Sequence, residues 1–237
     1  TRIAHRLGFA PIQKRNFAGA AINRLTNDWL SPITSADQEI RSSLSRLRSR
    51  CRELERNNDY VRRFLAGLEA NTLGSTGIGL QMKVTENGNR PDALANDLIE
   101  QAWKEWGKAS NCSVNGKFTW FDIQRLALRS TARDGDCLIR MLRTANGFQL
   151  QLLEGDRLDL NYNDERLKNG NEVRMGVEIN RLGKPVAYHI LDRHPADVST
   201  VNATRERIPA EQVIHPFITD RIAQTRGYPW MVSAMTR

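Results

Sequence analysis

Apolar residues recur every three or four positions between residues 40 and 68, and this spacing is the strongest constraint on the fold. Asn58 alone interrupts the stripe, which contains Ile40, Leu44, Leu47, Cys51, Leu54, Val61, Leu65 and Leu68. Ser35 precedes the stripe and Gln38 follows three positions later, which is the pattern of a capping box at a helix start. The sequence therefore predicts one long amphipathic helix over residues 36–70.

The segments on either side of this helix differ in pattern. Residues 1–34 show weak periodicity and scattered apolar positions, so they predict an N-terminal arm. Glycines at 74–79 end the long helix, and alternating apolar residues over 78–84 predict a strand after the turn. Capping residues and apolar spacing predict two further helices, one over about 91–107 and one over about 119–133.

Strand signals dominate the rest of the chain. Asn146-Gly147 is the sequence of a tight hairpin turn between two alternating runs. Alternation and turn residues together predict strands at about 136–143, 148–153, 173–180, 184–191 and 213–217. Because helices come first and hairpin-linked strands follow, the predicted fold class is α+β, with the long helix and the other helices packed on a mostly antiparallel sheet.

Positive charge is concentrated near the N-terminus. The 237 residues carry a net charge of +8, and residues 1–64 hold 13 basic against 6 acidic residues, which is +7 of that total. Such clustering permits a polyanionic partner, but a solvated or subunit-facing helix surface explains it equally. The candidate basic interaction surface consists of Arg41, Arg48, Arg52, Arg56, Arg62 and Arg63.

Residues able to carry catalysis are present without a convincing arrangement. The histidines lack metal-binding spacing, and the three cysteines are far apart, so we expect reduced buried thiols and no metal or cofactor. No apolar run is long enough to cross a membrane, and no secretory signal is visible. A metal-dependent phosphodiesterase would need convergent carboxylates, for which the candidates are Asp134, Asp136, Glu154, Asp156 and Asp159. Asp134 flanks a turn glycine and Glu154-Gly155-Asp156 also has the composition of a turn, which favours a structural role for these residues.

Short blocks of sequence carry the clearest clue to function. In order along the chain they are Arg56–Tyr60, Asn71–Gln81, Ala102–Trp106, Arg133–Asp136, Leu152–Leu158, Gly176–Asn180, Gly183–Tyr188, Arg207–Phe217 and Gln224–Trp230. These blocks and their order resemble the first half of lambda-type phage portal proteins. The chain is about half as long as such proteins, so the resemblance implies a wing-like domain over 35–227 and the start of the stem-leading central helix over 228–237, with the remainder of the portal absent.

The resemblance implies a structural role and no enzymatic activity. A portal subunit assembles with copies of itself into a ring, expected to be a dodecamer, at one vertex of the capsid. The ring forms the channel for double-stranded DNA during packaging and ejection, and it docks the terminase large subunit and later the head–tail connector. Major capsid or scaffold protein would be further partners, and the protein would reside in the virion after assembly in the host cytoplasm.

One joint and two alternatives complete the expectations. Arg226-Gly227 is the candidate joint between the wing and the central helix, because a glycine there permits a tight bend before Tyr228-Pro229. A standalone nucleic-acid-binding protein that uses the arginine-rich helix over 36–70 is the first alternative. The phosphodiesterase described above is the second and less favoured alternative.

Overall fold

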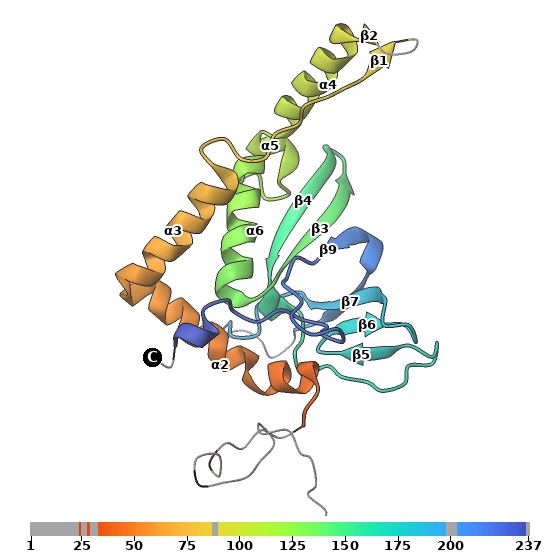
Figure 1. The fold of residues 1–237 in the computed structure, drawn as a ribbon. Helices are drawn as coiled ribbons and strands as arrows, with labels where there is room; N and C mark the ends of the chain where they lie inside the picture. Colours follow the sequence, from red (N-terminus) through yellow and green to blue (C-terminus); the bar gives the residue numbers. More distant parts are fainter. Residues whose placement is uncertain (1–23, 25–27, 29–32, 87–89, 198–202, 236–237) are drawn as a thin grey trace, which may run out of the picture. The chain divides into compact units, whose positions relative to one another are not determined.

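The computed structural model describes residues 24, 28, 33–86, 90–197 and 203–235. The chain divides into two units, Thr1–Thr34 and Ser35–Arg237. The predicted arm over 1–34 lies almost wholly outside the described residues. The second unit contains helices followed by antiparallel strands (Figure 1), so the predicted α+β class is confirmed.

Two helices replace the single helix predicted over 36–70. Helix α2 (Ala36–Asn57) and helix α3 (Asp59–Leu73) are separated by Asn58, whose backbone is extended at φ −125° and ψ 117°. The Asn58 side chain accepts hydrogen bonds from the backbone N–H groups of Tyr60 and Val61, while its own N–H donates to the carbonyl of Leu54. Asn58 therefore caps both helices, and the one-helix prediction is wrong because the capping bonds compensate for the break.

The predicted strand over 78–84 is also wrong. The end of this segment lies beside helix α4 (Ala93–Trp106), and its backbone donors bond to side chains instead of to a neighbouring strand. Met82 N–H donates to Glu100, and Val84 N–H donates to Asn96. Among the described residues that follow, two short strands pair with each other, β1 (Thr85–Glu86) and β2 (Arg90–Pro91).

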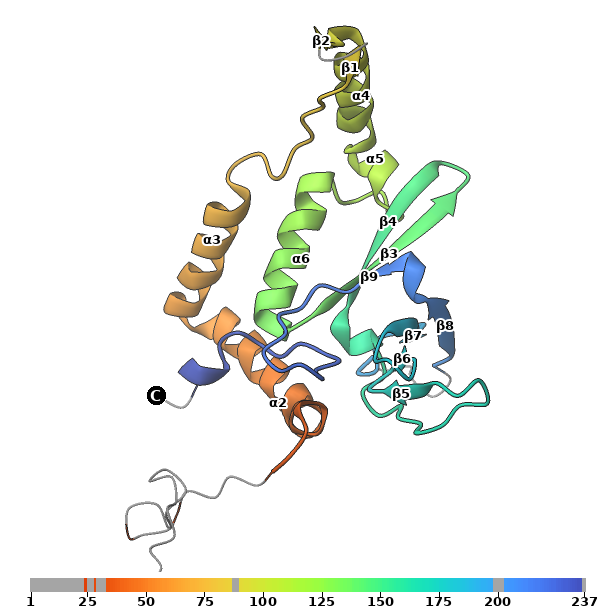
Figure 2. The ribbon, with the colours of Figure 1, turned by 45° about the vertical axis from the view of Figure 1, so that its right-hand side comes forward.

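Helix α6 (Trp120–Asp134) is confirmed, and it begins at the predicted cap. Thr119 and Asp122 form the reciprocal bonds of a capping box. Helix α6 contacts α2 and α3 on one side and strand β3 on another (Figures 1 and 2). Together with the short helix α5 (Ala109–Cys112), it covers the sheet through an apolar cluster that contains Trp106, Phe118, Trp120, Cys112, Ile123, Leu150, Ile139 and Met141.

The predicted hairpin at Asn146-Gly147 is confirmed. Strands β3 (Cys137–Thr144) and β4 (Gly147–Glu154) pair along their whole length, and Gly147 adopts a φ of +97° in the turn. Strand β9 (Val213–Ile214) pairs with the other edge of β3. The described part of the chain thus contains a three-stranded sheet in the order β4-β3-β9.

A second sheet has four antiparallel strands in the order β5-β6-β7-β8. These strands are β5 (Glu172–Arg174), β6 (Val177–Ile179), β7 (Pro185–Leu191) and β8 (Arg205–Pro209). The strand predicted over 173–180 is in fact two strands, because Met175 and Gly176 both adopt positive φ, +49° and +83°, and reverse the chain. Strand β8 was not predicted, since its alternation is short and highly charged.

One apolar core joins the two sheets. Its buried members are Leu138, Leu153, Leu158, Val177, Ile179, Tyr188, Ile190, Ile208 and Val213. All three cysteines are free and buried as predicted, and burial raises the pKa of Cys51 and Cys137 to about 12, so these thiols stay protonated. Among the described residues, no helix combines the length and apolar character that a membrane span requires.

The C-terminal segment, which is described over residues 215–235, returns from the sheets to the helices. Among its described residues up to 235, regular structure is limited to one 3-10 turn, η5 (Val232–Ala234). Residues 236–237 lie outside the described part. The central helix expected over 228–237 therefore stays a prediction.

Candidate functional site

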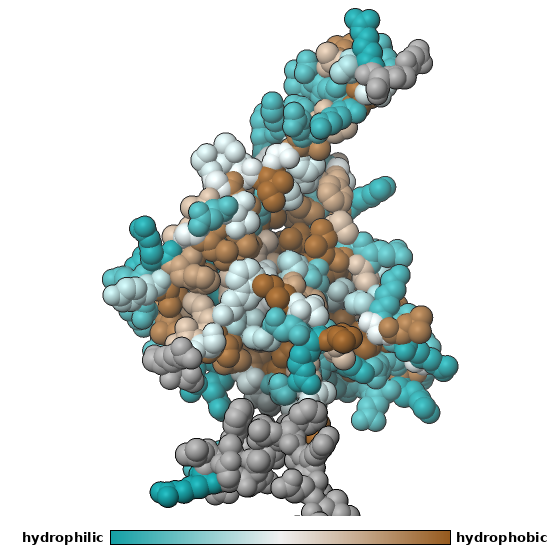
Figure 3. Space-filling model, viewed as in Figure 1, coloured by the Kyte–Doolittle hydropathy of each residue, from teal (hydrophilic) through white to brown (hydrophobic). Residues whose placement is uncertain are grey.

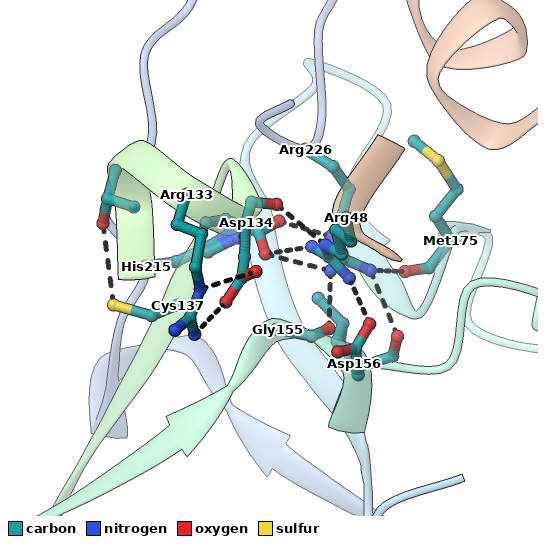
Figure 4. Close-up of polar contacts among 12 residues, drawn as sticks. Arg48, Arg133, Asp134, Cys137, Gly155, Asp156, Met175, His215 and Arg226 are labelled. Carbon is teal, nitrogen blue, oxygen red and sulfur yellow. Dashed lines mark hydrogen bonds and ion pairs between the residues drawn. The ribbon is translucent and has the colours of Figure 1, made fainter. Parts of the chain in front are cut away.

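A buried arginine joins the C-terminal segment to both sheets. The Arg226 side chain is fully buried, and Figure 4 shows it converging with Arg48 on one group of oxygen atoms. Its guanidinium donates to Asp136 through Nε at 2.7 Å and through Nη2 at 3.2 Å. The remaining donors reach backbone carbonyls of Gly155 at 2.7 Å, Leu158 at 3.1 Å and Met175 at 3.3 Å. Arg226 thus ties the C-terminal segment to three separate stretches of the chain.

A second buried arginine enters the same group from helix α2. Arg48 is 2% exposed and donates to Asp136 at 2.5 Å, to Asp156 at 3.0 Å and to the carbonyl of Asp134 at 2.8 Å. Removing an ion from water is unfavourable unless several partners compensate it, and here every nitrogen of the Arg48 guanidinium donates to an oxygen. Arg48 therefore locks α2 against the turn that precedes β3.

Asp136 is the centre of the network. It is fully buried and accepts from Arg48, from Arg226 and from the Nε2 side of His215 at 3.3 Å. Burial alone would raise the pKa of Asp136, but Arg226 and Arg48 hold it well below its usual range. Burial lowers the pKa of His215, with Asp136 opposing the shift, so the imidazole stays neutral near pH 7.

An outer layer of ion pairs connects α2, α3 and α6. Asp134 is bound by Arg52 at 2.8 Å and by Arg133 at 2.7 Å, and Arg52 also pairs with Asp156 at 2.5 Å. Glu55 links Arg133 to Arg129 with distances of 2.9 and 2.7 Å. Arg129 reaches Glu69 of α3 at 2.5 Å, which completes a path from the buried centre to the second helix.

Two glycines allow the C-terminal segment to cross the turn after α6. A Cβ on Gly227 would lie 2.0 Å from the carbonyl oxygen of Gly135 and 2.6 Å from Cβ of Phe217. A Cβ on Gly135, which has a φ of +94°, would lie 2.4 Å from Cα of Tyr228. Trp230 N–H then donates to the carbonyl of Ala132 at 3.0 Å. The close approach, rather than a positive φ at Gly227, excludes a side chain there.

The structure separates the six arginines of the predicted basic surface into two groups. Arg48 is buried and Arg52 is half-buried, and both are occupied by carboxylates, so including them in an exposed surface was wrong. The exposed members are Arg41, Arg56, Arg62 and Arg63. Carboxylates more than 80 positions away in the sequence bind both arginines. Asp136 and Asp156 bind Arg48, and Asp134 binds Arg52, which explains why these two arginines are less exposed than the other four.

The carboxylates considered for metal-dependent hydrolysis do converge, but around arginines. Asp134 and Asp136 are buried in the network, and Asp159 pairs with Arg205 elsewhere. Glu154, Asp156 and His194 place ligand atoms within 4.8 Å of one another. A cation there would lie beside Arg48 and Arg52, which already bind Asp156, and like charges repel. These residues fit an ion-pair network better than a metal centre.

The sequence contains blocks that hold several residues of the network, but it does not show that these residues meet. Arg133–Asp136, Leu152–Leu158 and Gln224–Trp230 were each recognised as blocks, yet the aspartates were assigned to turns. Their shared contact with Arg226 and Arg48 is visible only in three dimensions. The one hint in the sequence is that two of these blocks contain aspartates while the third contains Arg226, so that opposite charges recur in separate blocks.

Comparison with known proteins identifies the family that these blocks indicate. Residues 23–237 match the sequence model of phage portal proteins of the lambda family. A probable portal protein of Halomonas phage phiHAP-1 is 37% identical over 227 residues, which cover 93% of this chain and 44% of that protein. The chain therefore spans less than half the length of this relative. Because the family model covers most of the sequence and the predicted resemblance is thereby confirmed, the chain belongs to the lambda family of phage portal proteins.

Proposed function

We propose that the chain forms the wing-like part of a portal subunit, which assembles into a dodecameric ring at one vertex of a phage capsid. In this role the ring surrounds double-stranded DNA during packaging and ejection. It docks the terminase large subunit, and later the head–tail connector, while major capsid or scaffold protein contacts its outside. Assembly takes place in the host cytoplasm and the finished ring is part of the virion. Family membership supports the proposal.

The observation that carries this function is the buried network around Asp136. A closed ring needs subunits whose two flanks keep a fixed relation, because small angular errors accumulate around the circle. Asp136, which precedes β3, binds Arg48 of α2 and Arg226 of the C-terminal segment, and Arg226 also donates to the carbonyl of Met175 between β5 and β6. Such a network suits a rigid structural subunit, and the aspartates in it are occupied by arginines rather than open to a substrate.

Arg226-Gly227 acts in this proposal as the joint between the wing and the central helix. Arg226 fixes the start of the C-terminal segment, and Gly227 permits its close crossing over Gly135. Residues 228–237 then lead toward the stem. The joint thus sets the direction in which the central helix would leave the wing.

The exposed arginines provide an interaction surface. Arg41, Arg56, Arg62 and Arg63 are exposed on α2 and α3, and we assign them to contact with an acidic surface of a neighbouring subunit. The test replaces all four with Gln and measures self-association and binding to short DNA duplexes over a salt titration. Loss of self-association without duplex binding supports the assignment. Salt-sensitive duplex binding that the variant abolishes favours the nucleic-acid-binding alternative.

Matched controls make this titration specific. The control replaces four exposed basic residues with Gln, namely Arg143, Lys168, Arg181 and Lys184. It removes the same charge from strand β3 and from the loops before β5 and between β6 and β7, while leaving α2 and α3 unchanged. This control should associate as the wild-type protein does. Equal losses in both variants would show a general charge effect and contradict the assignment.

Electron microscopy tests the proposed function as a whole. Protein expressed from the complete gene should form rings with a central channel in negative stain, and labelled protein should locate to one vertex of assembled capsids. A protein that stays monomeric under every assembly condition, or that is spread over all vertices, would overturn the proposal.

A further inference from the structure

Helix α4 presents an apolar face that nothing in the described structure covers. None of its 14 residues is buried. Leu94, Leu98 and Ile99 are 72%, 58% and 38% exposed. With a period of 3.6 residues, Ala95 and Ala102 lie on the same side of the helix as these three. Figures 1 and 2 show α4 and the β1–β2 pair leading away from α6, and Figure 3 shows hydrophobic atoms at the surface there.

The opposite face of α4 is already bound. Met82 N–H donates to Glu100 at 3.0 Å, and Val84 N–H donates to Asn96 at 2.7 Å, so residues 82–84 are held along that side. Asp92 caps the helix by accepting from the N–H of Ala95. Helix α4 is therefore capped and bonded along one side, while its two leucines are exposed in the described part of the chain.

A groove on the same chain has the complementary character. It lies between the break at Asn58 and the C-terminal segment, and its volume is about 460 Å³. Its lining is mostly apolar and consists of Leu54, Asn58, Tyr60, Val61, Phe64, Trp230, Met231, Ala234 and Met235. Tyr60 and Phe64 are 88% and 45% exposed, so its rim is open along α3. The buried indole N–H of Trp230 has no hydrogen-bond partner among the described residues.

The charges around the two surfaces are opposite in sign. Helix α4 and its cap are acidic, with four carboxylates and one lysine, namely Asp92, Asp97, Glu100, Glu105 and Lys104. The exposed charges on α2 and α3 between residues 50 and 63, the two helices that contribute to the groove, are four arginines and two carboxylates, namely Arg50, Arg56, Arg62, Arg63, Glu53 and Asp59. Complementary potentials favour encounter of such surfaces and fix the orientation of the complex.

We propose that the apolar face of α4 in one copy of this chain docks into the α2–α3 groove of a second copy. Leu94 and Leu98, one helical turn apart, have the spacing with which amphipathic helices anchor in apolar grooves. Because helix face and groove are different surfaces of one chain, each copy uses both, and the contact propagates from subunit to subunit as a ring requires. The inference rests on the proposed portal function and specifies one contact within it.

Two double variants and their mixture test the contact in the 237-residue chain. Leu94→Asp/Leu98→Asp removes the helix face, and Tyr60→Asp/Phe64→Asp removes the groove. Leu182→Asp, at a 92% exposed position between β6 and β7, is the matched control. Sedimentation velocity should show concentration-dependent association of the wild-type protein and the control. Each double variant should raise the dissociation constant by at least about tenfold, as expected for central apolar anchors.

The mixture gives the sharpest result. One double variant keeps its groove and the other keeps its helix face, so an equimolar mixture should form a 1:1 heterodimer and no larger species. Circular dichroism should show the wild-type melting temperature for all variants, because the changed positions are exposed. Association of either double variant at wild-type strength, a wild-type chain that stays monomeric at all concentrations, or a mixture without heterodimer would each overturn the proposal.

The outcomes separate this contact from the wider function. If protein from the complete gene forms channelled rings with all four substitutions in place, the portal function stands and the α4 contact is wrong. If wild-type association follows the mixing scheme but no rings and no vertex location are found, the contact stands and the portal proposal is wrong.

Discussion

Arg226 and Asp136 form a fully buried ion pair although they lie 90 positions apart in the chain. Two nitrogens of the guanidinium reach the two carboxylate oxygens at 2.7 and 3.2 Å. Arg48 binds the same carboxylate from α2, so a single Asp136 side chain balances two buried cations together with Asp156. The stability of the domain should therefore depend on this residue more than on any exposed ion pair.

Asp136→Asn should destabilise the domain by about 3–5 kcal/mol, because it leaves two buried arginines short of negative charge while keeping nearly the same shape. Urea denaturation followed by tryptophan fluorescence measures the free energy of unfolding. The matched control is Glu206→Gln, which breaks the pair with Arg140 where the carboxylate is 58% exposed, and it should lose no more than about 1 kcal/mol. Equal losses in the two variants would contradict the central role of Asp136.

Gly227→Val should lower stability by about 3 kcal/mol, because its first side-chain atom would lie 2.0 Å from the Gly135 oxygen and the backbone must move apart. In protein from the complete gene, the variant should also reduce ring formation and the DNA packaging rate. Gly79→Val is the control, since a Cβ there meets nothing within 4 Å, and it should leave the melting temperature nearly unchanged. Normal rings and normal packaging in Gly227→Val would refute the joint.

Acid should weaken the fold in two stages. Burial lowers the pKa of both His215 and His189, so below their ordinary value of 6.5 the unfolded chain binds more protons than the folded one. Stability is then fully present above pH 6.5 and falls as pH decreases, by up to about 1.4 kcal/mol per pH unit for each histidine. The free energy of unfolding, measured from pH 8 to pH 5, should lose half of this slope in His215→Gln.

The second stage begins below the ordinary pKa of aspartate. Asp136 and Asp156 keep lowered pKa values in the fold, Asp136 through Arg226 and Arg48 and Asp156 through Arg48 and Arg52, each against the effect of burial. Their stabilisation is present above about pH 4 and disappears as the folded carboxylates become protonated. Asp136→Asn should remove part of this acid dependence. An unchanged acid limb in that variant would mean that other groups control it.

Asn58→Ala should destabilise the pair of helices by about 1 kcal/mol, because the N–H groups of Tyr60 and Val61 lose their side-chain acceptor. Chemical denaturation followed by the circular dichroism signal of the helices measures the change in the free energy of unfolding. Asn57→Ala, at the exposed last residue of α2, is the control and should be nearly neutral. Greater stability in Asn58→Ala would indicate that a continuous helix is favoured over the observed break.

Features that depend on neighbours in the chain could be predicted from the sequence. The Ser35 cap, the Thr119 capping box and the Asn146-Gly147 turn use bonds between residues at most four positions apart, and each was located correctly. The break at Asn58 was missed because apolar spacing continues through it on both sides. Both α2 and α3 contact α6 on either side of the break, and this long-range packing has no signal in the local spacing.

Features that depend on distant contacts could not be predicted. The charge of Arg48 and Arg52 suggests an exposed helix face, because nothing in the spacing of α2 identifies the carboxylates at the end of α6, before β3 and after β4 that bind them. The same limit applies to Arg226, for which the neighbouring glycine suggested a bend but the buried pair with Asp136 stayed invisible. The expected function came from the resemblance of the sequence blocks to a family, which the family model matches, and not from helix or strand patterns.

The five hydrogen bonds of Arg226 have a mechanical consequence. Tension applied to the polypeptide beyond residue 230 passes the backbone bond of Trp230 to Ala132 and then reaches Arg226, whose guanidinium binds Asp136, Gly155, Leu158 and Met175. Because one planar group carries all five bonds, the Arg226 side chain shares the load among several acceptors. A pull transmitted along the chain is thereby spread across two sheets before any single strand can peel away.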